Sequence, residues 1–313
     1  MRPRLTHWAI ATLIAGVLAT TPAHATSKNG FDLTGSSVPV AEIHPGGPPR
    51  DGIPAIDRPH FVSAAQADFL APSDPVLGIV HRGEARAYPV RILNWHEVVN
   101  DRIGGEAVAI TYCPLCGSGV AFVAEQGDTT LDFGVSGLLY NSDVLLYDRG
   151  SQSLWSQLMG RAISGPMKGT MLIALPLVHT TWANWRTLNP DSRVLSPNTG
   201  HQRAYGRDPY AGYAENETLY FPVAFRSAGF HPKERVLGVH VGDAYKAYPF
   251  MELHKGPALF EDTLGGQKLI IRFDKTHERA EAFDSRGEQL AGTTLFWFAW
   301  YAFHPDTAVH RAP

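Results

Sequence analysis

Residues 110–120 read Ile110-Thr111-Tyr112-Cys113-Pro114-Leu115-Cys116-Gly117-Ser118-Gly119-Val120, and they contain both cysteines of the chain. The apolar run that leads in, Ala107 to Tyr112, predicts a buried strand. Gly117 and Gly119 allow a tight turn with close backbone approach. The residues from Gly119 to Val123 then predict a second strand. Two thiols in a turn at a strand end form either a redox pair or a metal-binding pair.

An internal repeat surrounds this stretch. Its three matching segments are offset by 160 residues and then by 161: Val76-Leu77-Gly78-Ile79 with Val236-Leu237-Gly238-Val239, Arg86-Ala87-Tyr88-Pro89 with Lys246-Ala247-Tyr248-Pro249, and Asp101-Arg102-Ile103-Gly104-Gly105 with Asp262-Thr263-Leu264-Gly265-Gly266. Each copy predicts a hairpin, a short turn or helix, a Gly-Gly turn and a strand. We therefore expect a mainly β fold with short helices (α+β), in which duplicated half-domains, about 76–123 and 236–284, pack into one β-rich body.

The two copies differ at the thiols. Cys113 corresponds to Asp274 in the second copy, and Cys116 corresponds to His277. The second copy keeps the scaffold residues and lacks the sulfurs. This difference predicts one site, in the first copy.

The N-terminus has the pattern of a secretory signal peptide over residues 1–25. Arg2 and Arg4 form a basic start, Trp8 to Thr20 is apolar, and Ala23-His24-Ala25 is a small-residue cleavage site. The apolar run is too short to span a bilayer, and we expect no transmembrane segment in the mature chain. The pattern predicts export, to a bacterial periplasm, with cleavage after Ala25. Residues 26–60, rich in Gly, Pro and Ser, predict an extended N-terminal arm, and residues 61–313 a single domain.

The net charge and the number of cysteines argue against two kinds of role, nucleic-acid binding and a structural disulfide. The 313 residues carry 27 basic and 30 acidic side chains. Removing Arg2 and Arg4 with the signal peptide leaves 25 basic residues against 30 acidic ones, a net charge of −5. Such a balance does not favour a nucleic-acid partner. Export exposes the thiols to an oxidising compartment, but closing so short a loop would contribute only about 2 kcal/mol, so a structural disulfide is the weaker explanation.

Several motifs together resemble the domain of unknown function 3179 family over roughly residues 60–310. They are Tyr112-Cys113-Pro114-Leu115-Cys116-Gly117-Ser118, Trp95-His96-Glu97-Val98-Val99-Asn100-Asp101, Ser136-Gly137-Leu138-Leu139-Tyr140-Asn141-Ser142-Asp143, Tyr147-Asp148-Arg149, Ser153-Leu154-Trp155-Ser156-Gln157 and Trp297-Phe298-Ala299-Trp300. The resemblance implies the domain and supports the choice of residues. It implies no particular reaction.

The first functional hypothesis is a soft-metal site. Thiolates with an imidazole suit copper(I) or zinc, with copper favoured. The expected ligands are Cys113, Cys116 and His96, completed by His304 or His179. An open site of this kind would be oxidative or redox-active. A further set of residues is expected to orient the ligands: Asn141, Asp143, Asp148 and Trp155.

Two alternatives remain open. A periplasmic thiol–disulfide oxidoreductase also uses Cys-x-x-Cys, although no amphipathic helix follows the pair here to lower a thiol pKa. A non-catalytic module with a fixed disulfide would use the clustered aromatic residues to bind a ligand or partner. The aromatic C-terminal run from Leu295 to Phe303 favours core packing. The sequence names neither a substrate nor a partner, and whether the protein is an enzyme stays open.

Overall fold

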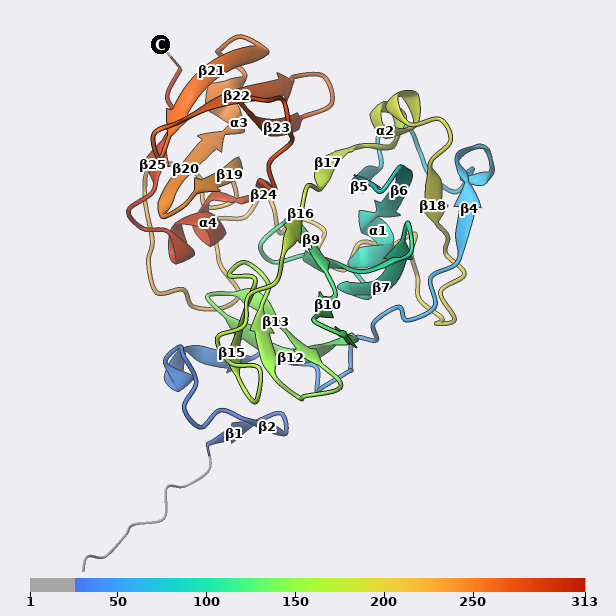
Figure 1. Ribbon diagram of the computed structural model, residues 1–313, viewed down its shortest axis with the longest axis vertical. Helices are drawn as coiled ribbons and strands as arrows, with labels where there is room; N and C mark the ends of the chain where they lie inside the picture. The colour runs from blue at the N-terminus through green and yellow to red at the C-terminus, as the bar shows by residue number, and fades with distance from the viewer. Residues whose placement is uncertain (1–25, 313) are drawn as a thin grey trace, which may run out of the picture.

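The computed structural model describes residues 26–312, and these residues form mainly β-strands. Five sheets of three to five strands are arranged as a propeller-like ring (Figure 1). The expected mainly β class is confirmed, but the arrangement is not two packed half-domains, because each repeat copy contributes two sheets and a fifth sheet has no duplicate. The described α-helices are short: α1 (Val90–Leu93), α2 (Trp182–Leu188), α3 (Phe250–Leu253) and α4 (Trp297–Phe303).

The first repeat copy contributes two sheets. One has the order β17-β5-β6-β18-β4 and the other the order β16-β9-β8-β7. Their strands are β4 (Phe61–Ser63), β5 (Pro75–His81), β6 (Glu84–Pro89), β7 (Val98–Ile103), β8 (Glu106–Cys113), β9 (Ser118–Val123), β16 (Ala174–Leu175), β17 (Val178–Thr181) and β18 (Arg193–Leu195). Ala107 through Cys113 are buried without alternation, which matches the continuous apolar sequence of β8.

The second copy repeats this plan in two sheets, β24-β19-β20-β25 and β21-β22-β23. Both Gly-Gly pairs of the repeat form two-residue hairpin turns with positive φ at both glycines, at Gly104–Gly105 and Gly265–Gly266. The strands are β19 (Arg235–Val241), β20 (Ala244–Pro249), β21 (Leu259–Leu264), β22 (Gln267–Asp274), β23 (Arg279–Asp284), β24 (Thr293–Phe296) and β25 (Ala308–Val309).

Four strands of the fifth sheet are inserted into the first copy, between β9 and β17, and the fifth strand comes from the segment that precedes that copy. The order of this sheet is β15-β14-β13-β12-β3. The strands are β3 (Ile43–Pro45), β12 (Phe133–Tyr140), β13 (Asp143–Asp148), β14 (Leu154–Ser156) and β15 (Arg161–Ser164), and short hairpins add β1 (Ser27–Lys28), β2 (Phe31–Asp32), β10 (Glu125–Gln126) and β11 (Thr129–Thr130). This insertion brings the turn between β12 and β13 to the cysteines.

The repeat is longer than its three sequence segments indicate. Trp185 of α2 and Trp300 of α4 each pack on a repeat glycine, because a Cβ at Gly78 or at Gly238 would lie 2.2 Å from the indole ring. Each indole N–H donates to a hydroxyl seven residues later, in Ser192 at 2.8 Å and in Thr307 at 2.9 Å. The pattern Trp-x-x-Trp-x4-Pro-Asp-Ser/Thr thus belongs to both copies, at an offset of 115 residues. The inserted sheet changes the offset and hides the relationship.

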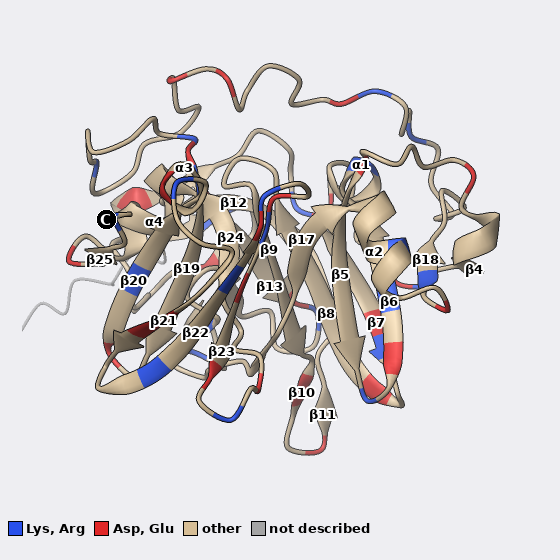
Figure 2. Ribbon diagram, turned by 90° about the horizontal axis from the view of Figure 1, so that it is seen from above, with Lys and Arg blue, Asp and Glu red and all other residues tan. Residues whose placement is uncertain are grey.

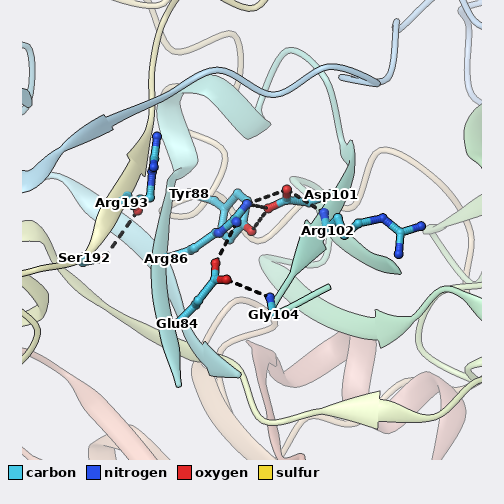
Figure 3. Close-up of polar contacts among 8 residues, drawn as sticks. All are labelled: Glu84, Arg86, Tyr88, Asp101, Arg102, Gly104, Ser192 and Arg193. Carbon is cyan, nitrogen blue, oxygen red and sulfur yellow. Dashed lines mark hydrogen bonds and ion pairs between the residues drawn. The ribbon is translucent and has the colours of Figure 1, made fainter. Parts of the chain in front are cut away.

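A partly buried ion pair is duplicated as well. Arg86 contacts Asp101 at 2.6 Å, and the Tyr88 hydroxyl donates to the same carboxylate (Figure 3). In the second copy Lys246 contacts Asp262 at 2.6 Å, and Tyr248 donates to that carboxylate at 2.9 Å. Because both copies keep this arrangement, we assign it to the scaffold and not to the chemistry of one site.

Residues 26–60, expected as an extended arm, contribute to the core and to one sheet. Phe31, Leu33 and Ile43 are buried, and β3 pairs with the edge of β12. The signal peptide expected over residues 1–25 lies outside the described residues.

The described chain contains no helix with the length and apolar character needed to cross a bilayer. Basic and acidic residues are interspersed over its strands and loops (Figure 2).

A long connection without α-helix or strand, residues 196–234, links β18 to β19. We call it the strap. It is fastened to the body by side chains near the cysteines. Asn94 donates to Asp208 at 3.0 Å, and the backbone N–H of Ala224 donates to Asn141 at 2.8 Å.

Candidate metal centre

Cys113 is the last residue of β8, and Cys116 lies in the four-residue turn, residues 114–117, that joins β8 to β9. Cys113 pairs with Ser118 across the turn. Gly117 has φ +60, and a Cβ there would approach the Phe296 ring to 3.0 Å. Phe296, at the end of β24, also donates its backbone N–H to the Cys116 carbonyl at 2.8 Å. A residue of the second repeat copy therefore packs against this turn and hydrogen-bonds to it. Both thiols are free and buried.

A second tight turn, between β12 and β13, faces these sulfurs. Tyr140 pairs with Asp143, and the two residues between them, Asn141 and Ser142, have φ of +52 and +64. Positive φ at both central positions is the geometry of a type I′ hairpin, which a residue with a side chain adopts at a cost. The Ser142 carbonyl accepts from both thiols, at 3.7 Å from Cys113 and 3.4 Å from Cys116.

Asp143 completes the group. One ligand atom from each of Cys113, Cys116 and Asp143 lies within 4.8 Å of the other two, and all three residues are buried. The Leu158 backbone N–H donates to Asp143 Oδ2 at 3.0 Å, whereas Oδ1 has no hydrogen-bond partner in the described part of the chain. Burial raises the pKa of Asp143 to about 8. A buried carboxyl with a free oxygen beside two thiols has the position of a metal ligand.

Glu97 adds a second buried carboxyl. It has a positive φ of +59, and its carbonyl accepts from the Tyr112 backbone N–H at 2.7 Å. Burial and the nearby Asp143 carboxylate raise the pKa of Glu97 to about 8. Burial also raises the pKa of the Cys116 thiol, and its neighbour Cys113 adds to that shift. Three acidic groups, Glu97, Asp143 and the Cys116 thiol, are thus held out of water, and none of them forms a salt bridge within residues 26–312.

The strap places a tyrosine against the thiols. The buried Tyr213 hydroxyl has no hydrogen-bond partner among the described residues, and the same is true of Ser142 Oγ. Burial raises the pKa of Tyr213, and the two cysteines add to the effect. Tyr213 is held by Tyr220, at 4.6 Å between ring centroids, and by Lys233, whose Nζ lies 4.1 Å from its ring centroid. Together with Asp143 Oδ1, three buried oxygens contributed by residues around the thiols lack a partner within residues 26–312, which is the condition that a bound group would relieve.

His96, the expected imidazole ligand, is not part of the three-residue group. Its Nδ1 lies 2.7 Å from the Pro54 carbonyl, and its Nε2 lies 2.6 Å from the Tyr205 hydroxyl of the strap. Burial lowers the pKa of His96 to about 4, so the ring is neutral near pH 7. The carboxylate of Asp143 takes the place beside the thiols that the sequence analysis gave to this ring.

The other two histidines also have different surroundings. His304 stacks on Tyr245 with ring centroids 4.0 Å apart and follows Trp300 at the end of α4. His179 Nε2 accepts from the Gly119 backbone N–H at 3.1 Å. A Cβ on Gly119 would lie 2.8 Å from that nitrogen, which explains the glycine. Neither histidine belongs to the thiol group.

The four residues expected to orient ligands separate into two places. Asn141 and Asp143 lie in the turn that faces the thiols, where Asn141 donates to the Ala302 carbonyl at 3.3 Å. Asp148 instead accepts from the Trp155 indole N–H at 2.9 Å and from the Ser151 backbone N–H at 2.6 Å, which closes the turn between β13 and β14. Asp143 was expected only as an orienting residue, and Glu97 and Tyr213 were not expected at all. The Asn-Ser-Asp break between two strand-like runs was the available signal for Asp143.

His179 yields a prediction about acid stability. Burial, and then the nearby Arg235, lower the pKa of His179 to about 3. In the unfolded chain this histidine takes up a proton near pH 6.5, whereas in the folded chain it stays neutral. The contribution of His179 to the free energy of unfolding is therefore fully present above pH 6.5 and is lost as the pH falls toward 3. His179→Gln retains a polar group and removes the titration. We expect the stability difference between wild type and the variant to shrink by about 1.4 kcal/mol per pH unit below about 6.5.

Denaturant unfolding of both proteins between pH 8 and pH 4.5 measures this difference. Both proteins carry the same other titrating groups, including Glu97 and Asp143. The effect of those groups on stability therefore cancels in the difference. Above pH 6.5 the difference should be constant. A difference that stays constant down to pH 4.5 would contradict the assignment of a buried neutral imidazole at this position.

Comparisons with known proteins place the chain in a family. Neither the search of curated proteins nor the search of solved structures returned a match. The family described as "Protein of unknown function (DUF3179)" matches residues 50–307, which include the thiol turn, the facing Asp143 turn and both repeat copies. The chain belongs to the DUF3179 family.

Proposed function

We propose that the protein binds one transition-metal ion between Cys113, Cys116 and Asp143. The observation that carries this proposal is the buried three-residue group, whose ligand atoms lie within 4.8 Å of one another. Burying ionisable groups without a counter-charge is costly, and a metal cation is the neutralising partner that two thiols and a carboxyl select together. The free Asp143 Oδ1 supports the same conclusion.

Zinc suits this group better than copper. Copper was favoured for a set of two thiolates and an imidazole, and both nitrogens of His96 are engaged elsewhere. Zinc accepts thiolate and carboxylate ligands together in tetrahedral sites, whereas copper(I) favours soft sulfur ligands. The Glu97 carboxyl and the Tyr213 hydroxyl are the candidates for the fourth position. Copper(I) remains the second candidate, because two thiols alone are soft ligands.

The burial of both thiols favours a metal-binding protein over a thiol–disulfide oxidoreductase. Reactive thiols in oxidoreductases are partly exposed and have lowered pKa values. Here Cys113 and Cys116 are 1% and 0% exposed, and burial raises the pKa of Cys116. A redox role stays an alternative because both thiols are free and near each other. It predicts reduction of insulin disulfides by the purified protein, which a closed metal site does not.

Elemental analysis of the protein, purified under reducing conditions without chelators, tests the proposal. We expect about one zinc ion per chain, and stoichiometric uptake by metal-free protein. Parallel titrations with Zn(II) and Cu(I) separate the two candidates. Less than about a tenth of an equivalent of either metal after titration would contradict the proposal.

Export is the remaining part of the proposal. The pattern of residues 1–25 predicts cleavage after Ala25. The mass of the protein recovered from the periplasm should then correspond to a chain that begins at Thr26. A metal would also protect the thiols from oxidation in that compartment.

A further inference from the structure

A cavity of about 800 Å³ lies between three of the five sheets. Its walls come from β9 and β16, from β15, and from β19, β20, β24 and α4. Two of its residues are large apolar side chains exposed to solvent, Met171 at 55% and Phe225 at 50%. Exposed apolar side chains that line a cavity are typical of a ligand site.

The charge of this cavity differs from that of the chain. The chain has more acidic than basic residues, yet no Asp or Glu lines the cavity. Arg161 of β15 is the one lysine or arginine among the lining residues; it is exposed, and its guanidinium forms no salt bridge within residues 26–312. An unpaired guanidinium at the edge of an apolar space favours a carboxylate, which it can bind through two parallel hydrogen bonds.

Another part of the cavity wall is aromatic. Tyr245 and His304 stack with their ring centroids 4.0 Å apart and 17° between their planes, and Trp300 lies 4.3 Å from the His304 ring. Phe122 and Leu172 contribute apolar surface. Such a wall packs well against the apolar body of a small molecule.

The cavity is separate from the metal centre. Leu158 lines the cavity and donates its backbone N–H to Asp143. Gln157, also in the wall, accepts from the Ser118 hydroxyl at 2.7 Å. The thiols themselves are buried and do not line the cavity. A molecule in the cavity would therefore contact the layer around the metal centre without reaching the sulfurs.

We propose that this cavity binds a small monocarboxylic acid with an apolar body. The carboxylate pairs with Arg161, and the apolar body lies against Phe122, Leu172 and Trp300. The proposal does not depend on a metal at Cys113, Cys116 and Asp143.

Titration calorimetry with two matched probes tests this proposal. The probes are 4-phenylbutyrate and 4-phenylbutan-1-ol, which share their apolar body and differ in the acid group. We expect the acid to bind at least about tenfold more tightly than the alcohol, because a charge-assisted bond to Arg161 is lost in the alcohol. Equal affinities, or no binding of either probe, would overturn the proposed class of ligand.

Variants locate the site. Arg161→Gln should weaken the acid at least about tenfold and leave the alcohol unchanged. Arg186→Gln removes the same charge from α2, outside the cavity, and should change neither affinity. Ala174→Trp places a large ring in the cavity wall and should abolish binding of both probes. Unchanged binding of the acid to Arg161→Gln, or of both probes to Ala174→Trp, would place the binding elsewhere and refute the proposal.

Discussion

Removing the metal with a chelator is expected to lower the thermal unfolding midpoint of the protein by about 5–10 °C. A ligand that binds only the folded chain adds about 4 kcal/mol of stability when its free concentration is a thousand times Kd. The ion would join the turn after β8 to the turn after β12, and these turns belong to different sheets. It would also balance the negative charge that the buried thiols and the Asp143 carboxyl acquire when they lose their protons to bind it. Differential scanning calorimetry of chelated and zinc-loaded samples measures the shift.

The control for this experiment is a protein that cannot hold the ion. Cys116→Ser should melt at one temperature whether zinc or chelator is present. Restoring zinc to chelated wild type should recover the original midpoint. Superimposable melting curves for chelated and zinc-loaded wild type would show that no ion couples the two turns.

Replacing any of the three ligands is expected to abolish metal retention. Cys113→Ser, Cys116→Ser and Asp143→Asn keep the size of each side chain and remove one ligand. Because even an outer partner of a ligand contributes about 10- to 100-fold in affinity, we expect each loss to exceed about 100-fold. Competition with a chromophoric chelator measures the affinity of each variant.

Ser118→Ala is the matched control for these variants. Ser118 is buried at the start of β9, paired with Cys113, and donates to Gln157 at 2.7 Å, but it is not in the three-residue group. Its variant should retain about one metal ion per chain. His96→Gln should likewise retain the ion, because the hydrogen bonds of His96 go to Pro54 and Tyr205. Loss of the ion from His96→Gln with retention in Asp143→Asn would reverse the assignment of the third ligand.

Individual strands and hairpin turns could be predicted from the sequence. Continuous apolar residues predict β8, and the glycine pairs predict the hairpin turns at Gly104 and Gly265. These features depend on residues near each other in the chain, whose conformational preferences act directly on the backbone. The duplicated segments were visible for the same reason.

The arrangement of the sheets could not be predicted from the sequence. The fifth sheet interrupts the first copy, so Trp185 and Trp300 match at a different offset from the rest of the repeat. The shared signal was the Trp-x-x-Trp spacing together with the glycines, Gly78 and Gly238, that leave room for the rings. Packing of a ring on a distant glycine has no periodicity in sequence that would reveal it.

The candidate site shows the same limit. The Cys-x-x-Cys spacing of Cys113 and Cys116 is visible in the sequence. Their third partner, Asp143, comes from the inserted sheet, and Tyr213 comes from the strap. His96 is close to the cysteines in sequence, yet its ring nitrogens are already satisfied. Sequence proximity therefore favoured an imidazole where the fold brings a carboxylate.

X-ray absorption at the zinc edge of the loaded wild-type protein addresses the central claim most directly, because it counts the atoms bound to the ion. The expected spectrum has about two sulfur neighbours near 2.3 Å and oxygen neighbours near 2.0–2.2 Å, without the multiple scattering of an imidazole ring. A shell without sulfur, or one with clear imidazole scattering, would contradict a centre built from Cys113, Cys116 and Asp143.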